Sequence, residues 1–197
     1  MTTYTRELGL LFGAACDGLR QESRQRALQR LVTEKDKISL GEEREVQVQA
    51  SFAMHWRLAG FHVELDSYGS GSASRRPDFG ILLPRTKEYL FLEFKLLWPG
   101  QGYQQAVTDL DKLNQMFEKD DKRVGLLTVG FAATRTHHKK FETVHEMMSE
   151  QIAVTTLYEQ VGLEKVSFDG IDERFPYAWV GMWVRRLTPE DDTEHTP

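Results

Sequence analysis

The chain has 197 residues, 28% of them charged and 40% hydrophobic, which is typical of one globular domain with a substantial core. Its single cysteine, Cys16, excludes an internal disulfide and any zinc site built from cysteines. The net charge of −5 and isoelectric point of about 5.7 argue against a dedicated nucleic-acid-binding domain, but they are compatible with a nuclease whose basic residues are local.

Apolar residues recur every three or four positions between residues 5 and 35, which predicts a long helix or a helical hairpin. Residues 8–16 faintly resemble a signal segment, but Glu7 and the shortness of the apolar run favour an amphipathic helix. We therefore expect a cytoplasmic protein without membrane contact and assign residues 1–38 to an N-terminal helical extension. This segment carries four arginines, Arg20, Arg24, Arg26 and Arg30. They form either a solvated face, which we favour, or a phosphate-contacting face.

A second helix is predicted between Ser39 and Gly60. Ser39 and Glu42 have the spacing of a capping box, and Gly60 is a natural helix end. Glu45 lies close to the predicted inward face of this helix. It is either a functional carboxylate or an ordinary member of a charged run.

Residues 61–68 alternate as a strand, and a Gly/Ser-rich loop follows. The loop ends in Arg75 and Arg76, immediately before Pro77 and Asp78. Guanidinium groups on such a loop suit phosphate contact, although the segment also reads as a simple connector.

Two apolar runs, residues 78–83 and 89–97, flank a charged connector of hairpin length. Because side chains alternate along a strand, Glu93 and Lys95 point to the same side. The second run is apolar on both faces otherwise, which indicates a strand in the interior of its sheet. A hairpin would also bring Asp78 towards Glu93.

Two carboxylates and a lysine that converge in this way form an oxygen-ligand site for a hard cation such as Mg²⁺. A cation held there would acidify water and neutralise charge on a phosphate. The lysine could orient the water or stabilise the developing charge. A charged pair on a partly exposed hairpin is the alternative, and the apolar surroundings of Glu93 and Lys95 argue against it.

The sequence Pro77-Asp78, a gap, and then Glu93-Phe94-Lys95 resembles the PD-(D/E)XK nuclease superfamily, which has the restriction-endonuclease-like fold. The resemblance implies that Asp78 and Glu93 bind Mg²⁺ and that Lys95 assists the attack of water on a phosphodiester. In that superfamily a glutamate from the preceding helix often completes the metal site, and Glu45 is the residue that matches it.

The elements that follow also fit this resemblance. A helix is predicted over residues 103–120 and a buried strand over 124–131, so that residues 40–131 have the element order of the superfamily core. A polar residue of the helix can face the active site in that family. Gln104 and Lys112 are the candidates here, and a surface pair of Asp109 and Lys112 explains the same residues.

The remaining chain adds a helix over residues 136–150, whose Lys139 and Lys140 could contact nucleic acid at the rim of the site. A short strand is expected at 166–168 and a final strand at 175–187, whose aromatic side chains either pack or stack on bases. We assign residues 39–187 to the nuclease core and 188–197 to a disordered acidic tail.

The sequence therefore predicts an α/β protein with a restriction-endonuclease-like core, a central mixed sheet flanked by helices. We expect a metal-dependent endonuclease that cleaves DNA with Mg²⁺, for which Mn²⁺ would substitute. The expected partners are DNA and either a second copy of the chain or a protein that delivers the substrate. The alternative is an inactive or weakly active subunit of a larger defence or mobile-element complex.

Overall fold

The computed structural model describes residues 3–33, 45–65, 77–97, 108, 113–115, 123–131, 157–168 and 177–185. Two helices come first, α1 (Thr3–Thr33) and α2 (Glu45–Leu58). Six strands follow, and Thr108 and residues 113–115 are helical. The strands are β1 (His62–Leu65), β2 (Phe79–Leu82), β3 (Tyr89–Leu97), β4 (Arg123–Phe131), β5 (Tyr158–Ser167) and β6 (Tyr177–Arg185).

The strands form one mixed sheet in the order β1-β2-β3-β4-β6-β5. Strands β3 and β4 are parallel, and every other neighbouring pair is antiparallel. Both β3 and β4 lie in the interior of the sheet, which explains why they are apolar on both faces. The predicted α/β class with a mixed sheet is confirmed.

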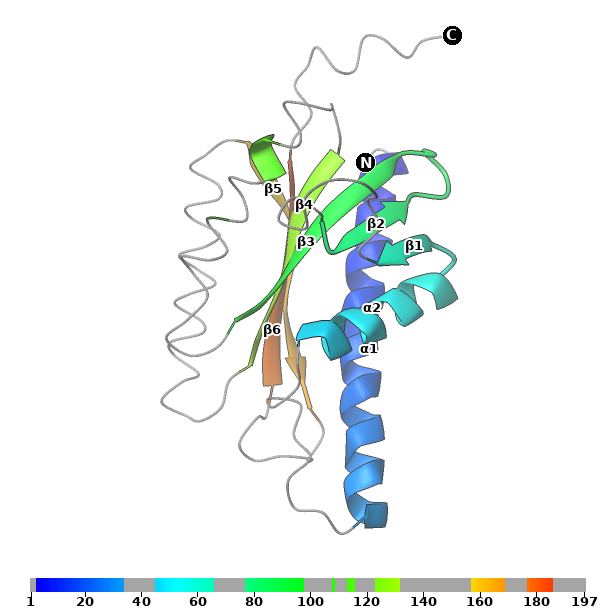
Figure 1. The fold of residues 1–197 in the computed structure, drawn as a ribbon, viewed down its shortest axis with the longest axis vertical. Coiled ribbons are helices and arrows are strands. Elements are labelled where there is room, and N and C mark those ends of the chain that lie inside the picture. The colour runs from blue at the N-terminus through cyan, green and yellow to red at the C-terminus, as the bar shows by residue number, and fades with distance from the viewer. Residues whose placement is uncertain are drawn as a thin grey trace, which may run out of the picture.

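Helices α1 and α2 cover one face of the sheet (Figure 1). We call this the helical face. Aromatic rings of α2 meet rings of the sheet: Trp56 packs edge-on against Phe79 at 4.9 Å, and Phe52 against Phe94 at 5.7 Å between ring centroids. All four side chains are fully buried. Such aromatic contacts stabilise beyond the area they bury, so they fix α2 on the β2–β3 hairpin.

Helix α1 packs against α2 and lies along β5. The indole Nε1 of Trp56 donates to the carbonyl oxygen of Leu11 at 2.9 Å, which links the two helices. Phe12 of α1 sits over Gly162, where a Cβ atom would come within 2.3 Å of its ring. The predicted helix over residues 5–35 is thus a single long helix, and it contributes to the same core as the sheet.

The end of α2 and the edge of the sheet are both closed by specific hydrogen bonds. Gly60 has a φ of +92°, and the amides of Gly60 and Phe61 donate to the carbonyl oxygens of Arg57 and Trp56. This is a Schellman end, as the sequence predicted for Gly60. Arg57 also donates to the carbonyl oxygen of Val63 on edge strand β1. That contact blocks part of the edge to other strands.

Glu7 of α1 fastens the β2–β3 connector to the helical layer. Its carboxylate is 2% exposed and accepts three hydrogen bonds, from the amides of Arg85 and Thr86 and from the Thr86 hydroxyl. Within the connector, Lys87 adopts a left-handed φ of +61°. A buried carboxylate that receives several donors is strongly anchored, so the hairpin has one defined position on α1.

The main difference from the sequence prediction lies in β5. We expected a short strand at 166–168, whereas the strand spans Tyr158–Ser167. A register shift between Gln160 and Gly162 breaks its alternation, and Gly162 has no side chain to mark a face. Most of its side chains are partly or fully exposed, as expected at the edge of a sheet. The sequence pattern is correspondingly weak.

Candidate functional site

The β2–β3 hairpin brings Asp78 next to Glu93. Phe79 pairs with Leu92 in the antiparallel ladder, so continuing the register by one residue sets Asp78 opposite Glu93. Side chains of directly opposed residues project from the same face of an antiparallel pair. The predicted approach of the two carboxylates is therefore a consequence of this register.

Lys95 joins the same face two residues after Glu93. The parallel ladder pairs Glu93 with Leu126 and Lys95 with Thr128 on β4. Their neighbour Phe94 points the other way, into the helical face, where it packs on Phe52. Asp78, Glu93 and Lys95 thus lie on the face of the sheet opposite to α1 and α2, which we call the polar face.

Asp78 has a structural contact as well as a place in this cluster. Pro77 has no N–H with which to continue the ladder, and Asp78 Oδ2 accepts the backbone amide of Phe94 at 2.7 Å. This hydrogen bond holds the carboxylate against the backbone of β3 at Phe94. Glu93 is only 6% exposed, whereas Asp78 and Lys95 are partly exposed. The cluster therefore runs from the sheet interior towards solvent.

Thr128 is a neighbour of the cluster that the sequence did not single out. It is fully buried, and its hydroxyl has no hydrogen-bond partner among the described residues. Beyond it, the Trp183 ring of β6 lies over Gly181, 2.2 Å from where a Cβ atom would stand. In the sequence, Thr128 is recognisable only as a polar residue inside the apolar run 124–131. That pattern does not show which face of the sheet its side chain joins, because the face depends on the strand register.

The other predicted residues are not brought into this cluster by the described structure. Glu45 is the first residue of α2, and its side chain lies outside the described residues. The expected capping box of Ser39 and Glu42 also lies outside the described residues. So do the remaining site candidates, which are Arg75, Arg76, Gln104, Lys112, Lys139 and Lys140. These residues stay predictions.

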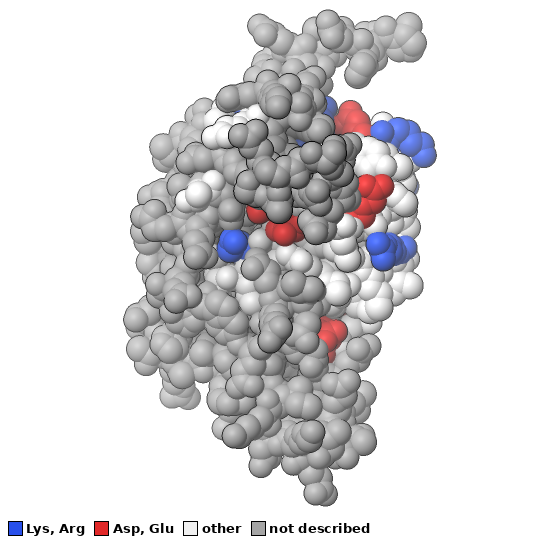
Figure 2. Space-filling view, viewed as in Figure 1, with Lys and Arg blue, Asp and Glu red and all other residues white. Residues whose placement is uncertain are grey.

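The cluster of Asp78, Glu93 and Lys95 consists of two carboxylates and one ammonium group. Among the described residues, no group of three or more His, Cys, Asp or Glu side chains gathers closely enough to hold a metal ion. Two carboxylates still suit Mg²⁺, which keeps waters and substrate phosphate oxygens as its other ligands. In Figure 2, acidic and basic side chains of the described residues are mixed over the visible face, without a patch of one sign.

Comparisons of the chain with protein-family models, curated proteins and solved structures find no match. Within the part of the chain that the structure describes, no helix is both long enough and apolar enough to cross a membrane.

Proposed function

We propose that the protein is a metal-dependent nuclease that hydrolyses DNA phosphodiester bonds at the polar face. The observation that carries the proposal is the convergence of Asp78, Glu93 and Lys95, which the β2–β3 register and the alternation of β3 bring to one place. Packing alone gives no reason to bury the Glu93 carboxylate in an interior strand, because a buried charge is costly unless it is paired or coordinated.

Each of the three side chains has a role in this proposal. The carboxylates of Asp78 and Glu93 would hold Mg²⁺ or Mn²⁺, with Glu45 as a further candidate ligand. A divalent cation supplies acidification of water and neutralisation of phosphate charge when it is bound. Lys95 is partly exposed beside Glu93, where its ammonium group can orient the attacking water or stabilise charge on the phosphate oxygens.

A second candidate function is a binding or assembly subunit that has this fold without catalysis. The contact between Asp78 and the Phe94 amide favours it, because capping the end of the β2–β3 ladder explains the aspartate without any metal. The two functions predict different consequences for the charge of Asp78, since an asparagine would keep the acceptor for the amide and lose the anion.

The experiment is a cleavage assay on linear, nicked, branched and single-stranded DNA with Mg²⁺ or Mn²⁺. Under the nuclease proposal, Glu93→Gln and Asp78→Asn lower the rate by about 10³-fold or more. Glu159→Gln removes the same charge from an exposed position on edge strand β5 and should leave cleavage unchanged. The variants should keep the wild-type circular dichroism spectrum and melting temperature to within a few degrees.

Metal binding separates the two functions independently of turnover. The nuclease proposal expects saturable Mn²⁺ binding that Asp78→Asn and Glu93→Gln both weaken. A wild-type protein that neither binds Mn²⁺ nor cuts any of these substrates would contradict the nuclease proposal and favour the assembly subunit. Equal cleavage by wild type and Lys95→Ala would remove the assigned role of the lysine.

A further inference from the structure

Thr128 carries a buried hydroxyl group that apolar packing does not explain. The residue lies in β4, in the interior of the sheet, and is fully buried. Its Oγ1 atom has no hydrogen-bond partner among the described residues. A buried hydroxyl group without a partner costs free energy, and a valine of the same shape would avoid that cost. Packing therefore accounts for the shape of this side chain and leaves its oxygen unexplained.

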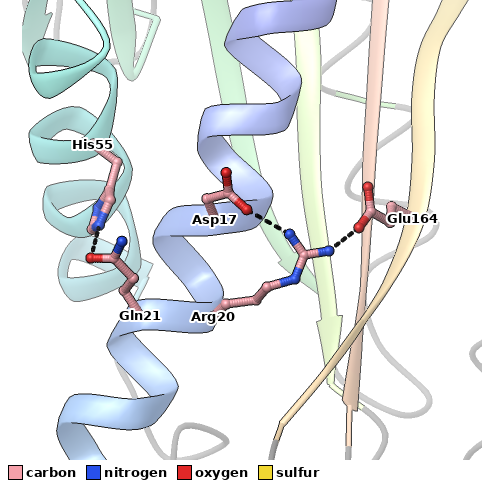
Figure 3. A network of polar contacts seen from close by, with 5 residues as sticks. All are labelled: Asp17, Arg20, Gln21, His55 and Glu164. Carbon is pink, nitrogen blue, oxygen red and sulfur yellow. Dashed lines mark hydrogen bonds and ion pairs between the residues drawn. The ribbon is translucent and has the colours of Figure 1, made fainter.

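The polar contacts of α1 show where buried and half-buried groups usually find a partner. Figure 3 shows the Arg20 guanidinium group between the carboxylates of Asp17, one turn earlier, and Glu164 on β5. Towards α2, Gln21 Oε1 lies 3.2 Å from His55 Nε2. The partners come from the same helix or from a side chain of the neighbouring element.

A hydroxyl group on an interior strand has fewer choices than one on a helix. Two helical serines, Ser23 and Ser51, also have buried hydroxyl groups without a partner among the described residues. In a helix, however, a serine hydroxyl can turn to the carbonyl oxygen four residues earlier. In a strand, the backbone groups point within the sheet towards the neighbouring strands. The Thr128 hydroxyl therefore needs another side chain or a bound molecule as its partner.

The two strands beside β4 offer Thr128 different neighbours. In β6 it is paired with Gly181, which has no side chain. The ring of Trp183 lies over Gly181 and presents its carbon atoms Cζ3 and Cη2 there. In β3 the paired residue is Lys95, whose side chain joins the same face of the sheet. Of the two residues paired with Thr128, Lys95 is thus the one that can supply a hydrogen-bond donor.

Lys95 can serve this hydroxyl group without leaving its cluster. An ammonium group has three N–H donors and sits on a flexible four-carbon stem. Because β2, β3 and β4 are consecutive in the sheet, Asp78 lies on one side of Lys95 and Thr128 on the other. A divalent cation held by Asp78 and Glu93 would repel the ammonium group. Thr128 offers that group an acceptor on the side away from Asp78.

We propose that Thr128 is a positioning residue, whose hydroxyl group accepts a hydrogen bond from the Lys95 ammonium group and holds it at the candidate metal site. The inference rests on the proposed function, because Lys95 needs a fixed place only if it orients water or stabilises charge on a phosphate. Thr128 itself does not touch the reacting atoms. It restricts a long side chain that otherwise has many rotamers.

The first test compares Thr128→Val with Thr128→Ser in the full-length protein. Valine keeps the shape and removes the acceptor, whereas serine keeps the hydroxyl group and removes a methyl group. We expect Thr128→Val to lower kcat for DNA cleavage with Mg²⁺ about 10- to 100-fold, with little change in KM. Thr128→Ser should keep kcat within about three-fold of the wild type.

Thermal denaturation of the same two variants should give the opposite order. Thr128→Val removes an unsatisfied hydroxyl group and should melt at the wild-type temperature or above it. Thr128→Ser leaves a small cavity and should melt a few degrees lower. A residue that only filled space would change activity and stability in the same direction. Lower activity in the more stable variant is therefore the signature of a positioning role.

NMR spectroscopy observes the Lys95 side chain without turnover. The ¹⁵N signal of its ammonium group is identified by its absence in Lys95→Ala, and relaxation measurements on it give an order parameter. At saturating Mg²⁺, the order parameter should be equal in the wild type and Thr128→Ser and about half as large in Thr128→Val.

The outcomes separate this inference from the nuclease proposal. Equal kcat in the wild type and Thr128→Val would overturn the positioning role and leave the nuclease proposal intact. An unchanged Lys95 order parameter in Thr128→Val would also overturn it, since the hydroxyl group would then act on another partner. An equal loss of kcat in both variants would assign Thr128 to packing. A wild-type protein that neither binds Mn²⁺ nor cleaves DNA would contradict the nuclease proposal, and the positioning role would fall with it.

Discussion

The two faces of the sheet are built on different principles. On the helical face, side chains of β2, β3, β4 and β6 pack on α1 and α2 in one apolar cluster. On the polar face, the interior strands carry Glu93, Lys95 and Thr128 among apolar residues. Strand β3 contributes to both faces, so that Phe94 and Lys95 are adjacent in sequence and belong to different environments.

This difference separates stability from function within a single strand. Burying apolar surface explains the apolar side chains of the helical face, since each of them is removed from water. The same argument does not explain a buried carboxylate beside a lysine, because polar groups cost free energy when they leave water. Substitutions on the two faces should therefore change different measured quantities.

The largest expected contrast comes from two neighbouring residues of β3. Phe94→Ala removes a fully buried ring from the aromatic cluster and should lower the free energy of unfolding by about 3–5 kcal/mol. Lys95→Ala should leave the free energy of unfolding within about 1 kcal/mol and lower DNA cleavage by at least about 10³-fold. Urea denaturation and the cleavage assay measure the two effects. A strong loss of stability in Lys95→Ala would show that the two faces are not separable.

Glu7 tests whether the helical layer supports the polar face through the hairpin. Glu7→Gln replaces one acceptor oxygen by an amide group that faces the N–H and O–H donors of Thr86. It should lower the free energy of unfolding by about 2 kcal/mol. Thr86→Val removes the hydroxyl bond alone and should cost about 1 kcal/mol, which makes it the graded control. Chemical denaturation measures both. No loss in Glu7→Gln would mean that the buried clamp does not anchor the hairpin.

A smaller change probes how tightly α1 lies on β5. Gly162→Ala would place a methyl group 2.3 Å from the Phe12 ring and should cost about 1–3 kcal/mol. Gly9→Ala is the control: nothing lies within 4 Å of its added Cβ atom, so it should be neutral or stabilise α1 by up to about 1 kcal/mol. Thermal denaturation of both variants checks the difference, and equal melting temperatures would contradict the close contact.

The smallest expected effect is the pH dependence that Cys16 adds to the helical face. Burial raises the pKa of the Cys16 thiol from its ordinary value of 9.0 to about 12, and Glu164 adds to the shift. The unfolded chain therefore loses this proton above about pH 9 while the folded chain keeps it, so stability falls by about 1.4 kcal/mol per pH unit up to about pH 12.

Urea denaturation of wild type and Cys16→Ala between pH 8 and about pH 10 isolates this contribution. The stability difference between the two proteins should shift against the wild type by about 1.4 kcal/mol over that whole range. Other groups that titrate there, such as Tyr4, cancel in the comparison. A difference that is independent of pH would contradict the burial of the thiol.

Much of the β2–β3 unit was predictable because its signals are local. Two apolar runs around a short charged connector predict the hairpin, and strand alternation places Glu93 and Lys95 together. The approach of Asp78 to Glu93 follows from the length of that connector. The hydrogen bond from the Phe94 amide to Asp78 was not predictable, because it depends on where the ladder ends.

Features between distant segments escaped the sequence. Strand β5 is half-exposed and irregular, and it was recognised only at its end. Arg24 and Lys165 line one pocket although they are far apart in the chain, because α1 packs against β5.

The sequence by itself determined the secondary structure of α1, α2, β2, β3, β4 and β6, because hydrophobic periodicity acts over a few residues. It also determined that Glu93 and Lys95 share a face. Only the tertiary structure decided which face the helices cover, that Thr128 stands beside Lys95, and that Arg20 is held between Asp17 and Glu164. Those facts depend on strand order and helix packing, which bring together residues that no local pattern connects.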